Sequence, residues 1–316
     1  MKDAVIIADL NSSAGEFARK VYENLKNRPE KLGVELNELV ITKFRDCEIK
    51  PKIKNNVIRK KCYFIHDSAK NPNEWLAELL FVNETLRNSS AGEIIDVLPY
   101  LRYCRQDRKD ESRVSISMKV VADCISTYAD RAVTVDAHFN QIQGFFDIPF
   151  DNLYSSRTAA DYLKEKYPDV LKNCVIMSPD AGGANRAEGF AKRFGVAEIA
   201  IGYKSRPRAG EIGKLKVIGD VKDKNVILLD DIIDSGKTLV KAAEECRKEG
   251  ALNVYAYAAH GLFTNGTDLQ GIEKIFTSDT VYRGNDKNVE VISMVGLFSE
   301  AIYRINEGKS ISELFN

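Results

Sequence analysis

The sequence predicts an α/β protein of two similar domains, each a mainly parallel sheet covered by helices on both faces. Short apolar, β-branched runs alternate with longer amphipathic segments, which is the pattern of parallel strands joined by helices. The length of 316 residues suits two domains of roughly 150 residues each. The alternation runs through both halves of the chain, so we expect domains at 1–149 and 150–316.

The apolar runs identify the strands. In the first half they lie at 4–7, 62–65, 93–98 and 132–135, and in the second at 174–177, 199–201, 226–229 and 254–258. Most of them are four to six residues long and rich in Val and Ile, as buried strands are. They predict the strands of the two sheets.

Helices are predicted where apolar residues recur at helical spacing. Phe17, Val21 and Leu25 recur every four residues after a capping box formed by Ser13 and Glu16. Further helices are expected at 74–86, 116–128, 157–167, 185–194, 238–249 and 297–305. The last of them can pack back on the first domain.

Composition excludes several classes of protein. Lys plus Arg and Asp plus Glu both number 46, whereas a protein that coats nucleic acid or an anionic membrane needs a basic excess. No apolar run approaches the roughly 18 residues of a membrane span. The six cysteines and three histidines form no zinc or iron–sulfur pattern. We expect a cytoplasmic protein with reduced thiols that binds neither nucleic acid nor membrane.

The strongest chemical motif follows the strand at 226–229. That strand runs directly into Asp230 and Asp231, and a short loop at 234–236 then opens a helix. Ligands bind at the carboxyl ends of parallel strands, and loop N–H groups at a helix N-terminus suit phosphate. Adjacent carboxylates suit sugar hydroxyls or a metal ion, so the motif predicts a ribose-phosphate site.

Two other interpretations of this motif remain open on the residues alone. The segment could end a Walker A loop, although Asp231 stands where that loop needs glycine. It could also be an ordinary strand–turn–helix with solvated acids.

The motif resembles the phosphoribosyl-diphosphate binding segment of type I phosphoribosyltransferases and of ribose-phosphate pyrophosphokinases. Four further blocks favour the second family. They resemble its F-x-D-x-E, R-Q-D-R-K, D-x-H-x-x-Q-I-Q-G-F-F-D-I-P and S-P-D-x-G-G-x-x-R-A segments, and they lie at 44–48, 105–109, 136–149 and 178–187. The resemblance runs nearly end to end. It implies two phosphoribosyltransferase-like domains and a diphosphokinase that converts ATP and ribose 5-phosphate to 5-phosphoribosyl 1-diphosphate and AMP.

In the second half, the resemblance assigns three groups of residues. Ribose 5-phosphate is bound by Asp230, Asp231, Asp234, Ser235, Gly236, Lys237 and Thr238. The transferred diphosphate faces a loop of Asp180, Ala181, Gly182 and Gly183, whose glycines let backbone N–H groups approach closely. The catalytic residues are Lys204 and Arg206, in a flexible loop at 204–216 that closes over ATP.

In the first half, the resemblance assigns ATP binding to Phe44, Asp46, Glu48, Arg105, Gln106, Asp107 and Arg108. Phe44 stacks on the adenine of a neighbouring subunit, which implies a homo-oligomer built from dimers, with a hexamer as one such form. His138 and Asp180 help to place the cofactor Mg²⁺, which keeps several waters and needs only one or two protein ligands.

Alternatives remain at the level of residues and of function. From sequence alone, Phe44 is as often a core residue, and a lone histidine such as His138 is more often structural than a ligand. A type I phosphoribosyltransferase shares the 226–239 motif but has no need of the arginine-rich segment. A catalytically silent synthetase-associated regulatory subunit shares the fold but loses site residues, which are present in this chain.

Overall fold

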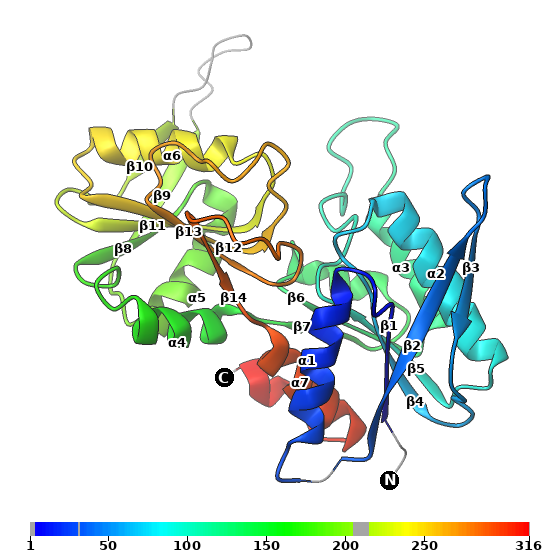
Figure 1. Ribbon diagram of the computed structural model, residues 1–316. Helices are drawn as coiled ribbons and strands as arrows, with labels where there is room; N and C mark the ends of the chain where they lie inside the picture. Colours follow the sequence, from blue (N-terminus) through cyan, green and yellow to red (C-terminus); the bar gives the residue numbers. More distant parts are fainter. Residues whose placement is uncertain (1–3, 31, 205–214, 316) are drawn as a thin grey trace. The chain divides into compact units, whose positions relative to one another are not determined.

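The chain forms two compact units, each with one seven-stranded sheet (Figure 1). The computed structural model describes residues 4–30, 32–204 and 215–315, with the backbone alone for Lys204 and Phe315. The first unit consists of Met1–Tyr154 and Met294–Asn316, and the second of Ser155–Ser293. The predicted α/β class with two similar, mainly parallel sheets is confirmed.

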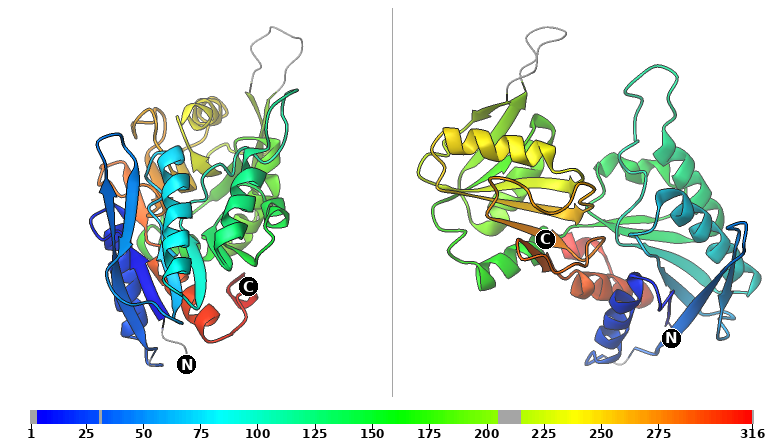
Figure 2. Two further views of the ribbon diagram at one scale, coloured as in Figure 1. Left: turned by 90° about the vertical axis from the view of Figure 1, so that its right-hand side faces the viewer. Right: turned by 45° about the horizontal axis from the view of Figure 1, so that its top comes forward.

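The first sheet is parallel except for a hairpin at one edge. Its strands are β1 (Ala4–Ala8), β2 (Val34–Lys43), β3 (Ile49–Ile53), β4 (Lys61–Ile65), β5 (Glu93–Leu98), β6 (Arg131–Val135) and β7 (Phe150–Leu153), in the order β3-β2-β1-β4-β5-β6-β7. Only β2 and β3 pair antiparallel. Helices cover both faces: α1 (Ala14–Lys26) and α7 (Val295–Asn306) pack together on one, and α2 (Pro72–Asn88) and α3 (Ser117–Tyr128) on the other (Figure 2).

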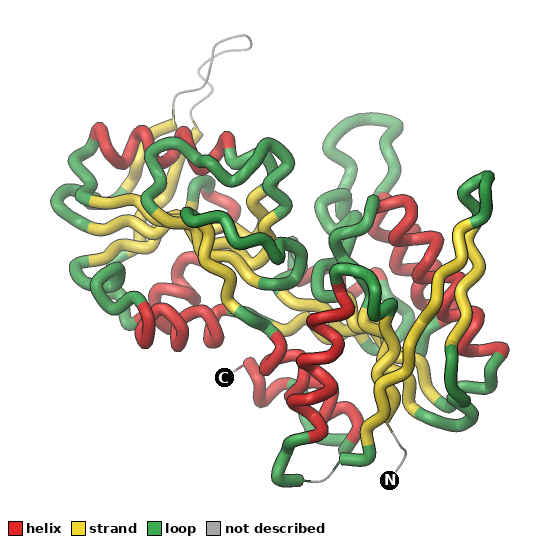
Figure 3. Tube along the Cα trace, viewed as in Figure 1, coloured by secondary structure: helices red, strands yellow, loops and turns green. Residues whose placement is uncertain are grey.

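The second sheet has the same plan. Its strands are β8 (Cys174–Ser178), β9 (Ile199–Lys204), β10 (Leu215–Ile218), β11 (Asn225–Ile233), β12 (Asn253–Gly261), β13 (Lys274–Ser278) and β14 (Val289–Ile292), in the order β10-β9-β8-β11-β12-β13-β14. Only β9 and β10 pair antiparallel. Figure 3 shows helices on both sides of these strands, with α4 (Ser156–Lys166) and α5 (Ala184–Phe194) packed together and α6 (Lys237–Lys248) opposite.

Burial of the central strands holds each unit together. All residues of β1 and all residues of β8 are buried, as apolar strands covered on both faces require. In the first unit, Phe17 of α1 meets Phe298 of α7 edge to face, with ring centroids 5.7 Å apart. In the second, Val226 and Leu228 of β11 lie in one apolar cluster with Leu239 of α6.

The pairing of the central strands allows the two sheets to be aligned residue by residue. Phe64 of β4 pairs with Ile7, the next-to-last residue of β1. In the same places of the second sheet, Leu228 of β11 pairs with Met177, the next-to-last residue of β8. Phe64 and Leu228 are therefore counterparts, and positions that follow them can be compared directly.

The division between the units differs from the expected one. β7 pairs in parallel with β6, so the first sheet extends past the boundary expected at residue 149. The last helix, α7, packs against α1 in the first unit, where Arg28 Nη1 lies 2.7 Å from Glu300 Oε2. The range 150–316 is thus shared between the two units, with its last helix packed back on the first, as the sequence analysis allowed.

Two further properties bear on function. Within the part of the chain that the structure describes, no helix combines the length and apolar character needed to cross a membrane. All six cysteines are free thiols, and four of them are buried: Cys62, Cys104, Cys174 and Cys246. Burial raises the pKa of Cys62, Cys174 and Cys246 to about 12, so these thiols stay protonated and poorly reactive.

Candidate active site

The carboxyl edge of the second sheet brings two predicted substrate loops together. β8 and β11 are parallel neighbours, so both chains leave the sheet at the same edge. The loop after β8 contains Asp180–Gly183, and the loop after β11 contains 234–236. These loops open α5 and α6 respectively, and strand ends that open helices in this way are where α/β sheets bind ligands.

The two adjacent acids of β11 differ in their surroundings, although their side chains lie close enough to interact. Asp230 has the parity of Val226 and Leu228, which pack with α6. Asp231 has the opposite parity and lies on the side of α5. Asp230 is partly exposed, whereas Asp231 is only 4% exposed.

Asp231 has a cationic partner that the sequence had not identified. Arg186, on α5, places its Nη1 2.7 Å from Asp231 Oδ1. The arginine side chain is 28% exposed, so the pair is largely shielded from water. A partly buried ion pair of this kind fixes the geometry of its carboxylate more firmly than a surface pair does.

The other acid, Asp230, is protonated more readily than an ordinary carboxyl group. Its Oδ1 accepts a hydrogen bond of 2.9 Å from the backbone N–H of Asp231. Burial, with repulsion from the Asp231 carboxylate, raises the pKa of Asp230 to about 8, and the Arg186 charge opposes this shift. Two carboxylates this close cannot both ionise easily.

The loop between β11 and α6 is shaped for an anion. Gly236 has φ of 72°, and a Cβ there would lie 2.3 Å from Leu269 Cδ2, so both the conformation and the packing require glycine. Asp234 Oδ1 accepts a hydrogen bond of 2.7 Å from Thr264 Oγ1, which ties the loop to the chain after β12. Lys237 is the first residue of α6 and is exposed. Backbone N–H groups of residues 235–238 thus lie at a helix N-terminus, where the dipole favours phosphate.

The loop between β8 and α5 is compact. Asp180 Oδ1 accepts from the Gly183 N–H at 3.1 Å, and the Ser178 hydroxyl donates to the Asp180 carbonyl at 2.7 Å. A Cβ on Gly183 would lie 2.4 Å from Ser178 Oγ, so this glycine permits the close turn. Ala181 and Gly182 complete the turn and are exposed.

The predicted catalytic residues lie only partly within the described chain. Lys204 is the last residue of β9 and pairs with Leu215 of β10 through the backbone. Its side chain, Arg206 and the rest of the predicted loop at 205–214 lie outside the described residues.

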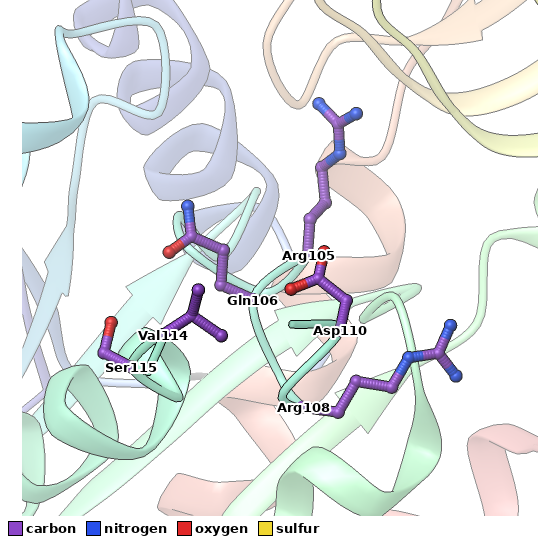
Figure 4. Close-up of a pocket in the computed structure, with 6 residues that line it drawn as sticks. All are labelled: Arg105, Gln106, Arg108, Asp110, Val114 and Ser115. Carbon is purple, nitrogen blue, oxygen red and sulfur yellow. The ribbon is translucent and has the colours of Figure 1, made fainter. Parts of the chain in front are cut away.

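In the first unit, the arginine-rich segment lines a pocket. β5 and β6 are parallel neighbours, and the segment follows β5 at their carboxyl edge. Figure 4 shows Arg105, Gln106, Arg108 and Asp110 on one loop. These residues line a pocket of about 560 Å³. Val114 and Ser115 complete the lining. Of the ATP residues predicted here, Asp107 is not part of this lining.

The chain after β6 meets the arginine-rich loop. The guanidinium of Arg108 lies 5.4 Å from the ring centroid of Phe139, within cation–π range. Phe139 in turn contacts His138 edge to face, at 4.5 Å between ring centroids. The predicted metal ligand His138 therefore belongs to the same edge of the first unit as the predicted ATP cations.

The hairpin of β2 and β3 carries the predicted adenine residues at its tip. Phe44 is 47% exposed, so the alternative that it packs in the core is wrong. The Phe44 N–H donates to the Glu48 carbonyl at 2.8 Å, and Asp46 Oδ1 accepts from the Glu48 N–H at 3.1 Å. Lys50 places its ammonium 5.8 Å from the Phe44 ring, so an aromatic face with nearby charge is available at the surface.

The predicted metal ligands suit a metal ion with few protein ligands better than one enclosed by the protein. Among the described residues, no group of three or more His, Cys, Asp or Glu side chains is arranged to hold an ion. A dedicated protein cage is thus absent from this part of the chain. The side chains of His138 and Asp180 can each offer one donor. That suits Mg²⁺ held chiefly by phosphates and water.

Sequence reasoning missed Arg186 and Thr264, which orient predicted substrate residues. Arg186 carried a signal, because it is the sole cation of the block at 178–187 and stands next to the glycine turn. Thr264 carried none, since an isolated threonine in a polar loop has no distinctive pattern.

Comparisons with known proteins agree with this architecture. Residues 5–128 match the N-terminal domain of ribose phosphate pyrophosphokinase, and residues 205–316 match the phosphoribosyl synthetase-associated domain. The chain is 40% identical over 307 residues to a ribose-phosphate pyrophosphokinase of Campylobacter jejuni, covering 95% of this chain and 96% of the relative. It is 39% identical to one of Haemophilus influenzae, covering 95% and 98%. A phosphoribosylpyrophosphate synthetase structure from Mycobacterium smegmatis superposes with a TM-score of 0.84 at 31% identity, covering 97% of this chain and all of that one.

Proposed function

The chain belongs to the ribose-phosphate pyrophosphokinase family, and from that premise we propose how its residues divide the reaction. The enzyme transfers the β,γ-diphosphoryl group of ATP to O1 of ribose 5-phosphate, giving 5-phosphoribosyl 1-diphosphate and AMP. The single observation that carries the assignment is the edge of β11, where an acid pair leads directly into a helix-opening loop.

The second unit binds the sugar. Asp230 accepts hydrogen bonds from ribose hydroxyls beside Asp231, and the loop after them holds the 5-phosphate through Asp234, Ser235, Gly236, Lys237 and Thr238. The glycine conformation at 236 and the N-terminus of α6 support this part of the proposal. The turn of Asp180, Ala181, Gly182 and Gly183 faces the transferred diphosphate with its backbone N–H groups.

The first unit binds ATP. Arg105, Gln106 and Arg108 meet the phosphates in the pocket of Figure 4, with Asp107 beside them. Phe44 stacks on adenine, while Asp46 and Glu48 accept hydrogen bonds from its amino group. We assign this adenine to a neighbouring subunit, so the working form is a homo-oligomer built from dimers. The exposure of Phe44 on a hairpin tip supports an intermolecular role.

Mg²⁺ is the cofactor in this proposal, with His138 and Asp180 as protein ligands. The ion screens the phosphate charges when bound. Lys204 and Arg206 then stabilise the negative charge that develops during transfer. We place the enzyme in the cytoplasm, in keeping with its free cysteines.

The chemistry asks the protein for position more than for covalent participation. O1 of the ribose attacks the β-phosphorus of ATP, the new O1–P bond forms, and O1 loses its proton. The bond between the β-phosphorus and the oxygen bridging it to the α-phosphorus breaks, and AMP leaves with that oxygen. A γ-phosphoryl transfer would instead leave ADP.

Product analysis tests the function. Incubation with ATP, Mg²⁺ and ribose 5-phosphate should yield AMP in step with ribose 5-phosphate consumption. ADP as the main nucleotide would reject the diphosphokinase mechanism. No turnover, with the chain folded and both substrates bound, would favour a silent regulatory subunit.

A further inference from the structure

We propose that Arg186 is a positioning residue for ribose 5-phosphate, which holds Asp231 in place and leaves Asp230 as the carboxylate that meets the sugar. This inference deepens the proposed function and rests on it. Arg186 is the third residue of α5, the helix that begins at the diphosphate turn. Its contact with Asp231 therefore ties that turn to the acid strand.

The geometry separates the roles of the two acids. Asp231 is 4% exposed and bound to Arg186 at 2.7 Å, so one of its oxygens is engaged before any sugar arrives. Asp230 is partly exposed and has the parity of the residues that pack with α6. The 5-phosphate loop opens that same helix. Asp230 is thus the more accessible of the two acids beside the phosphate loop.

The first unit has an acid at the position that matches Asp231, and its surroundings can be compared with those of Asp231. Asp67 is the counterpart of Asp231, since each lies three residues beyond the matched pair Phe64 and Leu228. The residue before it is His66, where the second unit has a second acid. Asp67 is held by the neutral hydroxyl of Ser13 at 2.6 Å. In the second unit, the matching carboxylate of Asp231 is bound by the Arg186 guanidinium.

Charge gives Arg186 a second effect on the site. Burial and the Asp231 carboxylate raise the pKa of Asp230, and the Arg186 guanidinium lowers it. Removing the guanidinium should therefore keep the proton on Asp230 to a higher pH. A protonated Asp230 is a poorer acceptor for sugar hydroxyls.

The test uses Arg186→Gln, Arg186→Lys and the matched control Lys192→Gln, which removes an exposed cation from the same helix. Arg186→Gln should raise KM for ribose 5-phosphate roughly tenfold or more, the usual scale for a lost charge-assisted hydrogen bond. KM for ATP should stay within about twofold. Arg186→Lys should recover part of the loss, and the control should match the wild type.

A pH profile separates positioning from a general structural role. KM for ribose 5-phosphate should be measured on both sides of the pKa of about 8 of Asp230. In Arg186→Gln its midpoint should move to higher pH, and in Arg186→Lys it should return toward the wild type. A midpoint that stays in place, or equal losses for both substrates, would overturn the proposal.

A double-mutant cycle keeps the proposal testable if Arg186→Gln is poorly folded. Added to Asp231→Asn, Arg186→Lys should change KM for ribose 5-phosphate by less than twofold, because it acts through Asp231. Full additivity would reject the inference. If the wild type itself fails to bind ribose 5-phosphate, the proposed function fails; if it binds and the Arg186 variants behave like it, only this inference fails.

Discussion

The two sheets share one topology, but the residues that follow matching positions of strands β4 and β11 have different surroundings. In the first unit, the side chains of the two residues after β4 are hydrogen-bonded to other parts of the protein. Asp67 Oδ1 accepts from Ser13 Oγ at 2.6 Å and from the Ala69 N–H at 2.9 Å. His66 is buried, with Nε2 2.9 Å from the Trp75 carbonyl. In the second unit, the residue that matches His66 is Asp230. It stays partly exposed beside the predicted phosphate loop.

The difference teaches that an unusual pKa alone does not mark a functional site. Burial lowers the pKa of His66 to about 3 and raises that of Asp96 to about 8. Both belong to the first unit, and Asp96 lies in the middle of β5, where Asn83 Nδ2 donates to it at 2.8 Å. Asp230 has a similar pKa, but it lies at the carboxyl edge with an acid neighbour. Location separates the two cases.

The largest effect on activity should come from the two predicted catalytic residues of the second unit. Lys204→Ala should lower kcat by about 10²–10³, because an electrostatic contact made mainly in the transition state contributes to rate rather than to binding. Arg206→Ala should behave alike, and the double variant should lose less than the product of the two. Steady-state kinetics decide this, with Lys172→Ala, an exposed lysine of the same unit, as control. A tenfold rise in KM for ATP with unchanged kcat would make Lys204 a binding residue.

The next largest effect is expected at the second sheet, and one acid from the matching edge of each sheet is compared. Above about pH 8, where Asp230 is ionised, Asp230→Asn should raise KM for ribose 5-phosphate by about 10- to 150-fold, from roughly 1.5–3 kcal/mol for a charge-assisted hydrogen bond. Asp67→Asn, in the first unit, should leave that KM within twofold and change only stability. Equal KM effects of the two variants would remove the distinction between the edges.

A smaller effect concerns how the first unit contributes to catalysis. Phe44→Ala should raise KM for ATP roughly tenfold, since base stacking on an aromatic ring is worth about 1–3 kcal/mol. Binding of ribose 5-phosphate should hardly change. Phe81→Ala, which removes an equally exposed phenylalanine from α2, is the matched control. A fully active monomer in light scattering would refute the intermolecular assignment of Phe44.

The smallest effect on activity should come from Asp96, which serves the fold. Its pKa of about 8 in the folded chain exceeds the ordinary 3.8, so between these values the unfolded chain has lost a proton that the folded chain keeps. The contribution of Asp96 to the free energy of unfolding should therefore fall as pH rises from about 4 to about 8, by an amount on the order of a few kcal/mol.

In urea unfolding, Asp96→Asn should remove this contribution and reduce the pH dependence, of which Asp230 supplies a further part, and it should leave kinetics unchanged. Asp123→Asn, an exposed acid on α3, should keep the slope. If Asp96→Asn retained the full slope, the titrating group would lie elsewhere.

Sequence predicted the buried centre of the fold better than its margins. Continuous apolar runs gave the central strands, such as β1 and β8, because both faces of these strands are covered. The strands β3, β10 and β14 lie at sheet edges, and β2 lies next to one. These four half-exposed strands alternate weakly between apolar and polar residues and were not identified. β7 and β13 were missed as well, since each is short and has few apolar residues.

The candidate site was predictable where chemistry is local in sequence. The acid pair, the glycine turn and the arginine-rich loop are contiguous motifs, and the structure presents each within one unit. Contacts between distant segments were not predictable, as Arg186 with Asp231 shows. Ser13 is a further case: its hydroxyl, expected to cap α1, makes no cap hydrogen bond and donates to Asp67.

The number of ribose 5-phosphate molecules bound per chain tests the division between the two edges most directly. Equilibrium dialysis of the full chain with labelled ribose 5-phosphate and Mg²⁺ should give one site per chain, although the chain contains two sheets of the same topology. Asp230→Asn should weaken that site strongly, and Asp67→Asn should leave it intact. Two equivalent sites per chain, or loss of binding in a folded Asp67→Asn variant, would contradict it.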